Sequence, residues 1–364
     1  MVTTTHRLIL EDARHMEQLK EQSIDLVVTS PPYPMIEMWD EQFCSINPAI
    51  KKEIDCGNYN GAFEAMHQIL DGVWQELWRV MKTGAIACIN IGDATRTNNQ
   101  KFQLYANHAR IQQQFQALGF DTLPLILWRK QTNAPNKFMG SGMLPAGAYV
   151  TLEHEYILLF RKGNKRQFNT AADKHQRKQS AYFWEERNTW FSDLWDFKGV
   201  RQDTNNRELR RRSAAFPFNL PYRLINMYSL NGDTVLDPFA GTGTTLLAAM
   251  ATGRNSVGYE LDPNFLPALH TMVEQNISYL RQVSIERIEN HLKFVQTRVG
   301  EGKKLKYLNS YFGFPVMTAQ EQDLQILFVE QIEKSGEQSF RVSYFDPQYI
   351  KSIAPEDLAI LNLK

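Results

Sequence analysis

Short apolar segments of strand length alternate with longer segments of helical spacing through most of the chain. The strand-like segments lie at residues 7–10, 24–28, 85–93, 122–128, 154–160 and 256–259. Apolar residues at helical spacing lie between some of them, over 63–81 and about 105–118. Strands separated by helices predict an α/β fold, with a doubly wound, mostly parallel sheet and right-handed crossovers.

Other segments carry weaker patterns. Met16 and Leu19 predict a short helix after the first strand, and Gly84 is expected to end the helix over 63–81. Residues 35–60 are polar and have no clear period, which is more typical of a mobile substrate loop than of a linker. The segment 214–221 is expected to open a further helix that runs through Tyr228.

The chain beyond Asp262 has a different pattern. A long helical stretch is expected from 264 to about 299, followed by strand-like runs at 324–328 and 340–345. No chemical motif occurs there. We expect a C-terminal extension over 263–364, helical and then α/β, that completes a cleft, binds a partner or forms a dimer interface.

The strand at 24–28 ends in the sequence Thr29-Ser30-Pro31-Pro32-Tyr33-Pro34. The prolines fix φ and remove N–H groups, so that the carbonyls of Ser30 and Pro31 can point at a ligand. An exocyclic aromatic amine suits such a site, because its two N–H groups need acceptors and its ring can stack on Tyr33. Taken alone, the segment is equally compatible with a rigid turn.

A second motif lies far downstream. Residues 232–245 predict a strand, a tight turn with Gly241 and Gly243, and a helix from Leu246, and the next strand ends in Glu260. This is the layout of a nucleotide-type cofactor site, in which the glycines let the backbone approach the cofactor and the acid binds ribose hydroxyls. Leu246 replaces the third glycine of the dinucleotide pattern, which disfavours a nicotinamide dehydrogenase. Acids at both strand ends suit a cationic sulfonium and an amino acid.

Together the two motifs resemble the β-group amino-methyltransferases of DNA, which modify cytosine N4 or adenine N6. In this resemblance, Ser30-Pro-Pro-Tyr33 is the catalytic motif and Asp237-Pro-Phe-Ala-Gly-Thr-Gly-Thr244 is the S-adenosylmethionine motif, in the order of the β group. The resemblance covers about Leu8 to about Asp262. It implies a Rossmann-like, seven-stranded S-adenosylmethionine-dependent methyltransferase domain with an inserted target-recognition region.

The resemblance also implies site residues. The catalytic residues are Ser30, Pro31, Pro32 and Tyr33. The cofactor-binding residues are Asp12, Phe216, Asp237, Pro238, Phe239, Ala240, Gly241, Gly243, Thr244, Glu260, Leu261 and Asp262. For Asp12 a helix N-cap and for Phe216 ordinary core packing are the alternatives.

Charge is unevenly distributed. The whole chain has 40 Lys and Arg against 40 Asp and Glu, but residues 161–213 have 14 against 7, mixed with aromatic residues. Such a mixture suits phosphate contact and base reading, and a solvated charged surface is the alternative. We interpret 161–213 as the target-recognition region, with 130–149 as a second loop facing the same cleft. The predicted DNA contacts are Arg177, Lys178, Arg201, Arg210, Arg211 and Arg212.

Composition argues against several classes of site and location. The three cysteines have no Cys-x-x-Cys spacing, which argues against a disulfide framework or a zinc site, and no metal site is expected. No apolar run reaches 18 residues, so we expect a soluble, cytoplasmic protein without membrane contact. We divide the chain into a catalytic half (1–160), the basic target-recognition region (161–213), an S-adenosylmethionine-binding half (214–262) and the extension (263–364).

The resemblance implies a site-specific DNA methyltransferase that acts on a base flipped out of duplex DNA. Within the family, Ser at the first catalytic position goes mostly with cytosine N4, and Asp or Asn mostly with adenine N6. We therefore expect cytosine N4, with adenine N6 as the alternative, in a restriction system with a cognate endonuclease and as a homodimer. A non-catalytic nucleic-acid-binding module and an RNA substrate are the remaining alternatives.

Overall fold

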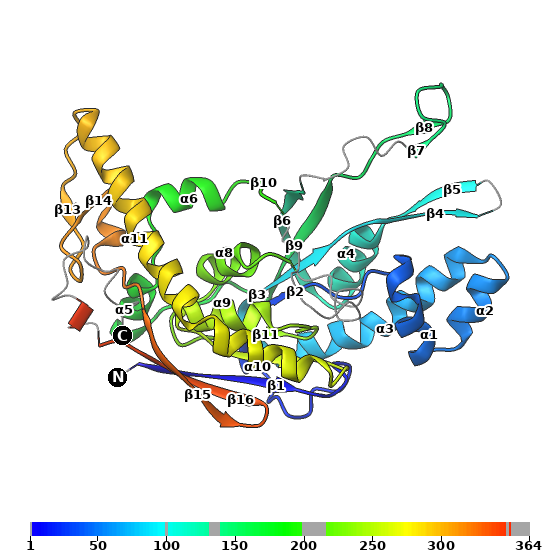
Figure 1. The fold of residues 1–364 in the computed structure, drawn as a ribbon, viewed down its shortest axis with the longest axis horizontal. Coiled ribbons are helices and arrows are strands. Elements are labelled where there is room, and N and C mark those ends of the chain that lie inside the picture. Colours follow the sequence, from blue (N-terminus) through cyan, green and yellow to red (C-terminus); the bar gives the residue numbers. More distant parts are fainter. Residues whose placement is uncertain (1, 99–100, 131–138, 199–215, 347–348, 351–364) are drawn as a thin grey trace.

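The computed structural model describes residues 2–98, 101–130, 139–198, 216–346 and 349–350. A ten-stranded mixed sheet runs through the molecule in the order β10-β6-β9-β3-β2-β11-β12-β1-β16-β15 (Figure 1). Its strands are β1 (Thr3–Ile9), β2 (Ile24–Thr29), β3 (Met81–Ile91), β6 (Phe120–Arg129), β9 (His154–Lys162), β10 (Leu194–Asp196), β11 (Thr234–Asp237), β12 (Asn255–Tyr259), β15 (Val329–Gly336) and β16 (Ser339–Tyr344).

The expected seven-stranded sheet forms the middle of this larger one, from β6 to β1. Strands β3, β2, β11, β12 and β1 pair in parallel, and β9 runs antiparallel between β3 and β6. The sheet continues past both ends of this unit, with β10 beside β6 and with β16 and β15 beside β1. The α/β doubly wound fold is therefore confirmed, and the C-terminal extension adds to the same sheet.

Helices cover both faces of the sheet. They are α1 (Asp40–Ile46), α2 (Ala49–Asp55), α3 (Tyr59–Val80), α4 (Asn107–Ala117), α5 (Ala171–Gln179), α6 (Trp184–Trp190), α8 (Asn219–Tyr228), α9 (Thr244–Thr252), α10 (Phe265–Gln275) and α11 (Ile277–Gly300). Side chains of β2 alternate between the two cores that result: Val27 packs with residues of α3 and α4, whereas Leu26 and Val28 pack with residues of α8 and α9. In the described residues no helix has the length and apolarity needed to span a lipid bilayer.

Three sequence predictions of local structure are wrong. Residues 13–19 form turns rather than a helix. The segment 35–60 is mostly helical, with η1 (Glu37–Trp39), α1 and α2 held by the buried side chains of Phe43 and Ile50. These helices bury so few side chains that their sequences show no period. The run 324–328 pairs with no strand, and β15 begins only at Val329.

The long helical stretch of the extension is two helices, α10 and α11, which meet at Asn276. The remaining elements are short: the hairpins β4 (Ala94–Asn98) with β5 (Lys101–Tyr105), β7 (Met139–Gly140) with β8 (Ala148–Tyr149), β13 (Tyr307–Leu308) with β14 (Pro315–Val316), and η2 (Ala319–Glu321). Figure 1 shows the first two hairpins projecting from the body on the same side of the molecule.

The basic segment after β9 packs onto the C-terminal extension. The Phe183 ring stacks on His291 of α11 at 3.9 Å between centroids, and Glu186 of α6 pairs with Arg287 of α11 at 2.7 Å. Trp184 donates its backbone N–H to Glu321 at 2.8 Å. Much of 161–198 therefore serves as scaffold.

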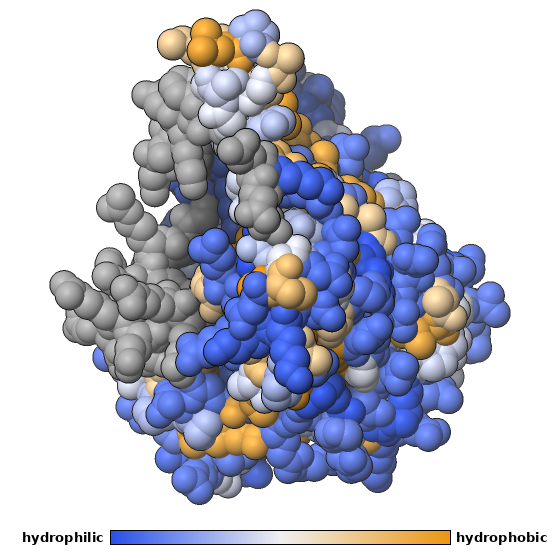
Figure 2. Space-filling view, turned by 90° about the vertical axis from the view of Figure 1, so that its right-hand side faces the viewer, coloured by the Kyte–Doolittle hydropathy of each residue, from blue (hydrophilic) through white to orange (hydrophobic). Residues whose placement is uncertain are grey.

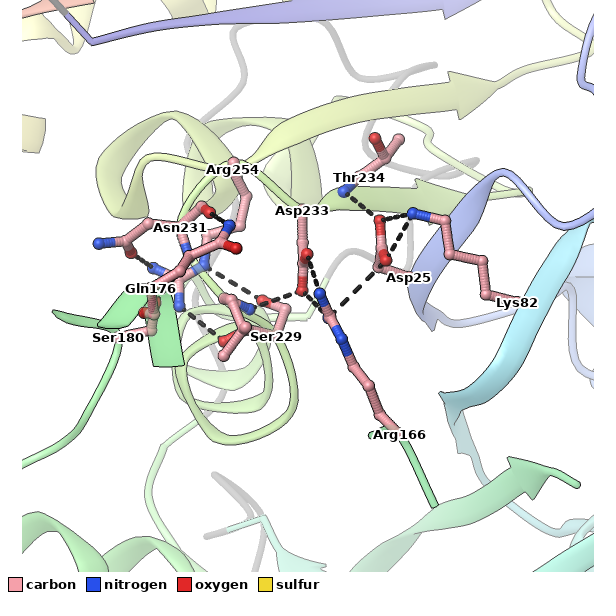
Figure 3. A network of polar contacts seen from close by, with 12 residues as sticks. Asp25, Lys82, Arg166, Gln176, Ser180, Ser229, Asn231, Asp233, Thr234 and Arg254 are labelled. Carbon is pink, nitrogen blue, oxygen red and sulfur yellow. Dashed lines mark hydrogen bonds and ion pairs between the residues drawn. The ribbon is translucent and has the colours of Figure 1, made fainter. Parts of the chain in front are cut away.

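A charged network joins the amino ends of β2 and β11 (Figure 3). The Asp25 carboxylate accepts from Lys82 Nζ at 2.7 Å and from the Thr234 N–H at 3.0 Å. Arg166, from the basic segment, donates to Asp233 at 2.6 Å. These contacts join neighbouring strands, so the positive charge of Arg166 has a partner within the protein.

Candidate active site

A pocket of about 880 Å³ opens at the carboxyl ends of β2 and β11. These strands are parallel neighbours, with Leu26 opposite Val235 and Val27 opposite Leu236. Ser30 and Asp237 therefore lie at the same edge of the sheet, and Thr29 Oγ1 donates to Asp237 at 2.6 Å. This is the place where open α/β sheets bind their ligands.

The pocket gathers nearly all of the predicted cofactor-binding residues. Those in its wall are Asp12, Phe216, Asp237, Pro238, Phe239, Ala240, Gly241, Thr244, Glu260, Leu261 and Asp262. Ser30, Pro31 and Pro32 also line it. Two motifs separated by about two hundred residues thus share one cavity.

The two glycines of the turn after β11 have different roles. Gly241 has φ 51°, and a Cβ at this position would meet no atom within 4 Å. Gly243 has φ 86°, is absent from the pocket wall, and a Cβ there would lie 2.4 Å from Leu269 Cδ1. The prediction that Gly243 lets the backbone approach the cofactor is therefore corrected: this glycine starts α9 and lets α10 pack closely.

The acid after β12 holds the glycine turn. Glu260 Oε2 accepts from the Gly241 N–H at 2.8 Å, and Oε1 accepts from the Asp262 N–H at 2.9 Å. Burial raises the pKa of Glu260, and these backbone bonds oppose the increase. The carboxylate thus lies in the pocket wall with its orientation fixed.

Asp237 is almost fully buried. Its carboxylate accepts from Thr29 and Thr245, each at 2.6 Å, and from the Phe239 N–H at 3.1 Å. Burial raises the pKa of Asp237 from 3.8 to about 6, although the three hydrogen bonds lower it. The folded protein therefore binds this proton more tightly than the unfolded chain.

We expect the free energy of unfolding of an Asp237→Asn variant to lack the pH dependence that Asp237 gives the wild type. Because the folded-state pKa is the higher one, Asp237 favours folding below about pH 4 and loses that contribution as the pH rises to about 6. The loss amounts to at most about 3 kcal/mol. Urea unfolding of both proteins without ligand, at pH 4.5 and 7.5, measures it. Equal pH slopes for the two proteins would contradict the assignment.

A hydrogen-bonded cluster surrounds the catalytic motif. Tyr33 Oη donates to Glu155 at 2.9 Å and lies 3.1 Å from Ser30 Oγ. Asn90 Nδ2, at the end of β3, donates to Glu155 at 2.7 Å and to Tyr33 Oη at 2.8 Å. Lys130, which follows β6, pairs with the other oxygen of Glu155. The cluster joins β2, β3, β6 and β9.

The hydroxyl protons in this cluster have a defined direction. Tyr33 has one O–H, and an ionised Glu155 only accepts, so the Tyr33 proton points to Glu155. The 3.1 Å contact is then completed by the Ser30 O–H donating to Tyr33 Oη. Ser30 Oγ also accepts a longer hydrogen bond from Asn90 Nδ2 at 3.4 Å. A hydroxyl oxygen has two lone pairs, so one remains to accept from a ligand in the pocket.

Tyr33 itself is 7% exposed and is not in the pocket wall. Its ring packs against Gly92, where a Cβ would lie 3.0 Å from Tyr33 Cε2. Burial, followed by the Glu155 charge, raises the pKa of Tyr33 well above its usual value, so the phenol stays protonated. Little of the ring is open for the stacking that the sequence suggested.

The segment 35–60, which the sequence predicted to be a loop, forms another wall of the pocket. Met38, Trp39 and Phe43 line the cavity together with polar residues of α1. The sequence interpretation assigned no role to Asn90 and Glu155, and it placed Lys130 and the residues of α1 only within loops expected near the substrate.

The predicted DNA contacts are not brought to this pocket. Arg177 stacks over Phe168 at 4.5 Å, and Lys178 pairs with Asp323 at 3.4 Å. Their helix, α5, bonds through Gln176 to the Asn231 carbonyl, before β11 and thus at the amino ends of the parallel strands. Arg201, Arg210, Arg211 and Arg212 lie outside the described residues.

Similar proteins were found in sequence and in structure. A sequence model of the family described as DNA methylase matches residues 24–270. Type II methyltransferase M.MthZI of Methanothermobacter thermautotrophicus is 49% identical over 343 residues, which cover 94% of this chain and 95% of that protein. Type II methyltransferase M.MjaI of Methanocaldococcus jannaschii is 49% identical over 283 residues, covering 75% of this chain and 92% of that protein.

Among solved structures, the putative DNA modification methylase TTHA0409 of Thermus thermophilus, in complex with S-adenosyl-L-methionine, has a TM-score of 0.56 and 33% identity. The match covers 72% of this chain and 91% of that one. Both motifs of the pocket, Ser30–Tyr33 and Asp237–Thr244, fall inside the residues that the family model matches.

Proposed function

Because this chain belongs to the DNA methylase family, we propose that it methylates cytosine N4 in duplex DNA. Methyl transfer from S-adenosylmethionine to DNA is the activity of the family, and the choice of cytosine is our inference. The observation that carries this choice is Ser30: a neutral hydroxyl at the first catalytic position, which lines the pocket and keeps one lone pair beyond its contacts with Tyr33 and Asn90. The Type II names of the relatives support a role as the modification enzyme of a restriction system.

The pocket residues fit S-adenosylmethionine. The turn at Gly241 leaves open space beside the backbone, and Glu260 lies where ribose hydroxyls need an acceptor. Phe239 and Phe265 offer apolar surface for an adenine ring, and Asp262 adds negative charge for a cationic ligand. Asp12 also lines the pocket, but its carboxylate pairs with Arg14 at 2.6 Å. When bound, the cofactor supplies an electrophilic methyl group on its sulfonium.

In the proposed reaction, Ser30 Oγ accepts one N–H of the target amine and the Pro31 carbonyl accepts the other. An aromatic amine is a weak nucleophile because its lone pair is delocalised into the ring. Two acceptors outside the ring plane favour a pyramidal nitrogen and aim its lone pair at the methyl group. Since the amine lies inside a duplex, the base must first be flipped out, which costs a few kcal/mol.

Methylation of the amine would require its nitrogen to give up one proton, while the cofactor would leave as the neutral thioether. Ser30 takes this proton and passes its own to Tyr33, which passes its own to Glu155. The direction of the hydrogen bonds in the cluster supports this order, with Ser30 donating to Tyr33 and Tyr33 donating to Glu155. Lys130 partly neutralises the carboxylate, which keeps its charge tolerable beside the pocket.

Serine favours cytosine for a physical reason. The cytosine edge carries N3 and O2 acceptors next to the amino group, and a carboxylate at position 30 would repel them, whereas a hydroxyl does not. Adenine also has ring acceptors, so adenine N6 is the second outcome of the test below.

Nucleoside analysis tests the proposal. We expect duplex DNA treated with the enzyme and labelled S-adenosylmethionine to release N4-methyl-2′-deoxycytidine as the labelled nucleoside on digestion, identified by mass. N6-methyl-2′-deoxyadenosine as the sole product would overturn the choice of base and leave the family intact. Label that enters structured RNA in preference to duplex DNA would overturn the substrate. Fragments of known sequence, treated in the same way, give the recognition site.

A further inference from the structure

The β7–β8 hairpin carries an unusual apolar tip. Met143 is 88% exposed, Leu144 is 70% exposed, and Val150, just after the hairpin, is 84% exposed. No charged residue occurs from 139 to 152. Single exposed apolar residues are ordinary, but several on one projecting, uncharged loop are not. In Figure 2 this hairpin is the uppermost projection and shows hydrophobic colours at its end.

The hairpin is anchored at the catalytic cluster. The chain leaves β6 at Lys130 and returns into β9 at His154, and the Lys130 N–H donates to the Glu153 carbonyl at 2.8 Å. The Lys130 side chain pairs with Glu155, which accepts from catalytic Tyr33. The two ends of the hairpin therefore leave and rejoin the sheet beside the catalytic cluster.

The hairpin is also held from the side. Tyr149 of β8 stacks on Phe102 of β5, with 4.3 Å between ring centroids and planes 10° apart. Figure 1 shows the two hairpins standing together, away from the helices. The stack supports an extended element that has little core of its own.

We propose that Met143 and Leu144 form a wedge that inserts between base pairs when the target base leaves the duplex. This inference rests on the proposed function. The faces of DNA bases are apolar and become accessible where a step unstacks, and apolar side chains are the residues that proteins insert there. An uncharged tip has nothing to offer phosphates, whereas it can replace the stacking that the flipped base loses.

The test compares paired and mispaired targets in the variant Met143→Ser/Leu144→Ser. On a fully paired duplex containing the mapped site, we expect the variant to methylate roughly tenfold more slowly than the wild type, since unstacking is no longer offset. On the same duplex with a mismatch opposite the target base, we expect the variant and the wild type to react at rates within about twofold of each other, because a mispaired base needs little further unstacking. The ratio of the two rates is the readout, so that a general loss of folded enzyme cancels.

The matched control is Val299→Ser/Leu308→Ser. These residues are 57% and 58% exposed, and they lie on α11 and β13 of the extension. We expect this control to keep the wild-type ratio. If the tip variant keeps the wild-type ratio, the wedge proposal is wrong. It is also wrong if the tip variant changes oligomeric state in size-exclusion chromatography, because the tip would then contact a second copy of the chain. If the wild type methylates no duplex DNA, the proposed function fails instead.

Discussion

Replacing Ser30 by alanine is expected to lower the rate of methyl transfer by about 10²-fold or more. The hydroxyl lines the pocket and is the proposed acceptor for the target amine, and its removal leaves one N–H of that amine unpaired in the transition state. The cofactor pocket should be unaffected, because Asp237 is held by Thr29 and Thr245. The affinity for S-adenosylmethionine, measured by calorimetry, should therefore stay near the wild-type value.

Single-turnover kinetics with saturating cofactor and DNA measure this effect. Ser45→Ala is the matched control, since Ser45 also lines the pocket but its hydroxyl donates to the Gln42 carbonyl in its own helix. We expect this control to react at nearly the wild-type rate. If Ser30→Ala reacts as fast as Ser45→Ala while binding cofactor normally, Ser30 is not the acceptor.

The sequence was informative where short motifs coincide with strand ends. In a parallel sheet, the segments that follow β2 and β11 must emerge at the same edge, so the pairing of Val27 with Leu236 is enough to bring Ser30 and Asp237 together. The same reasoning placed Glu260 after β12 beside Gly241. The cofactor-binding residues implied by the resemblance thus lie together because of strand order and turn geometry.

The catalytic cluster was harder to predict because its members belong to different strands. Asn90 and Glu155 lie at adjacent ends of β3 and β9, which pair antiparallel, with Asn90 opposite Ile157. A polar residue at a strand end is common, and only the pairing register shows that these two meet Tyr33. The one available signal was that the strand-like run 85–93 ends in polar residues.

Charge counting misled the interpretation of residues 161–198. A surplus of Lys and Arg says nothing about where the partners lie, and here many partners are internal. Arg166 pairs with Asp233, Lys178 with Asp323, and Arg187 lies over the Phe191 ring at 4.4 Å. The two ion pairs link segments far apart in sequence, which no local pattern reveals.

Replacing Glu155 by glutamine is expected to lower kcat by about 10²-fold, with little change in the KM for DNA. Glutamine keeps an oxygen that accepts from Tyr33, but it loses the charge that orders the Ser30, Tyr33 and Glu155 hydrogen bonds and receives the proton. Glu155 acts on the amine through Ser30, and small losses of alignment at such a position can cost about 10²-fold. Its side chain is only partly accessible, and its oxygens contact Tyr33, Asn90 and Lys130.

Glu153→Gln provides the comparison, because it makes the same chemical change two positions away in the sequence. Glu153 pairs with Arg129 at 3.4 Å, with both side chains about half exposed, so the variant should keep nearly wild-type kcat. Both variants should melt near the wild-type temperature. If kcat for Glu155→Gln lies within twofold of that for Glu153→Gln, the charge of Glu155 takes no part in the mechanism. A fall in kcat at unchanged KM and melting temperature would show that Glu155 aligns Ser30 and does not merely stabilise the fold.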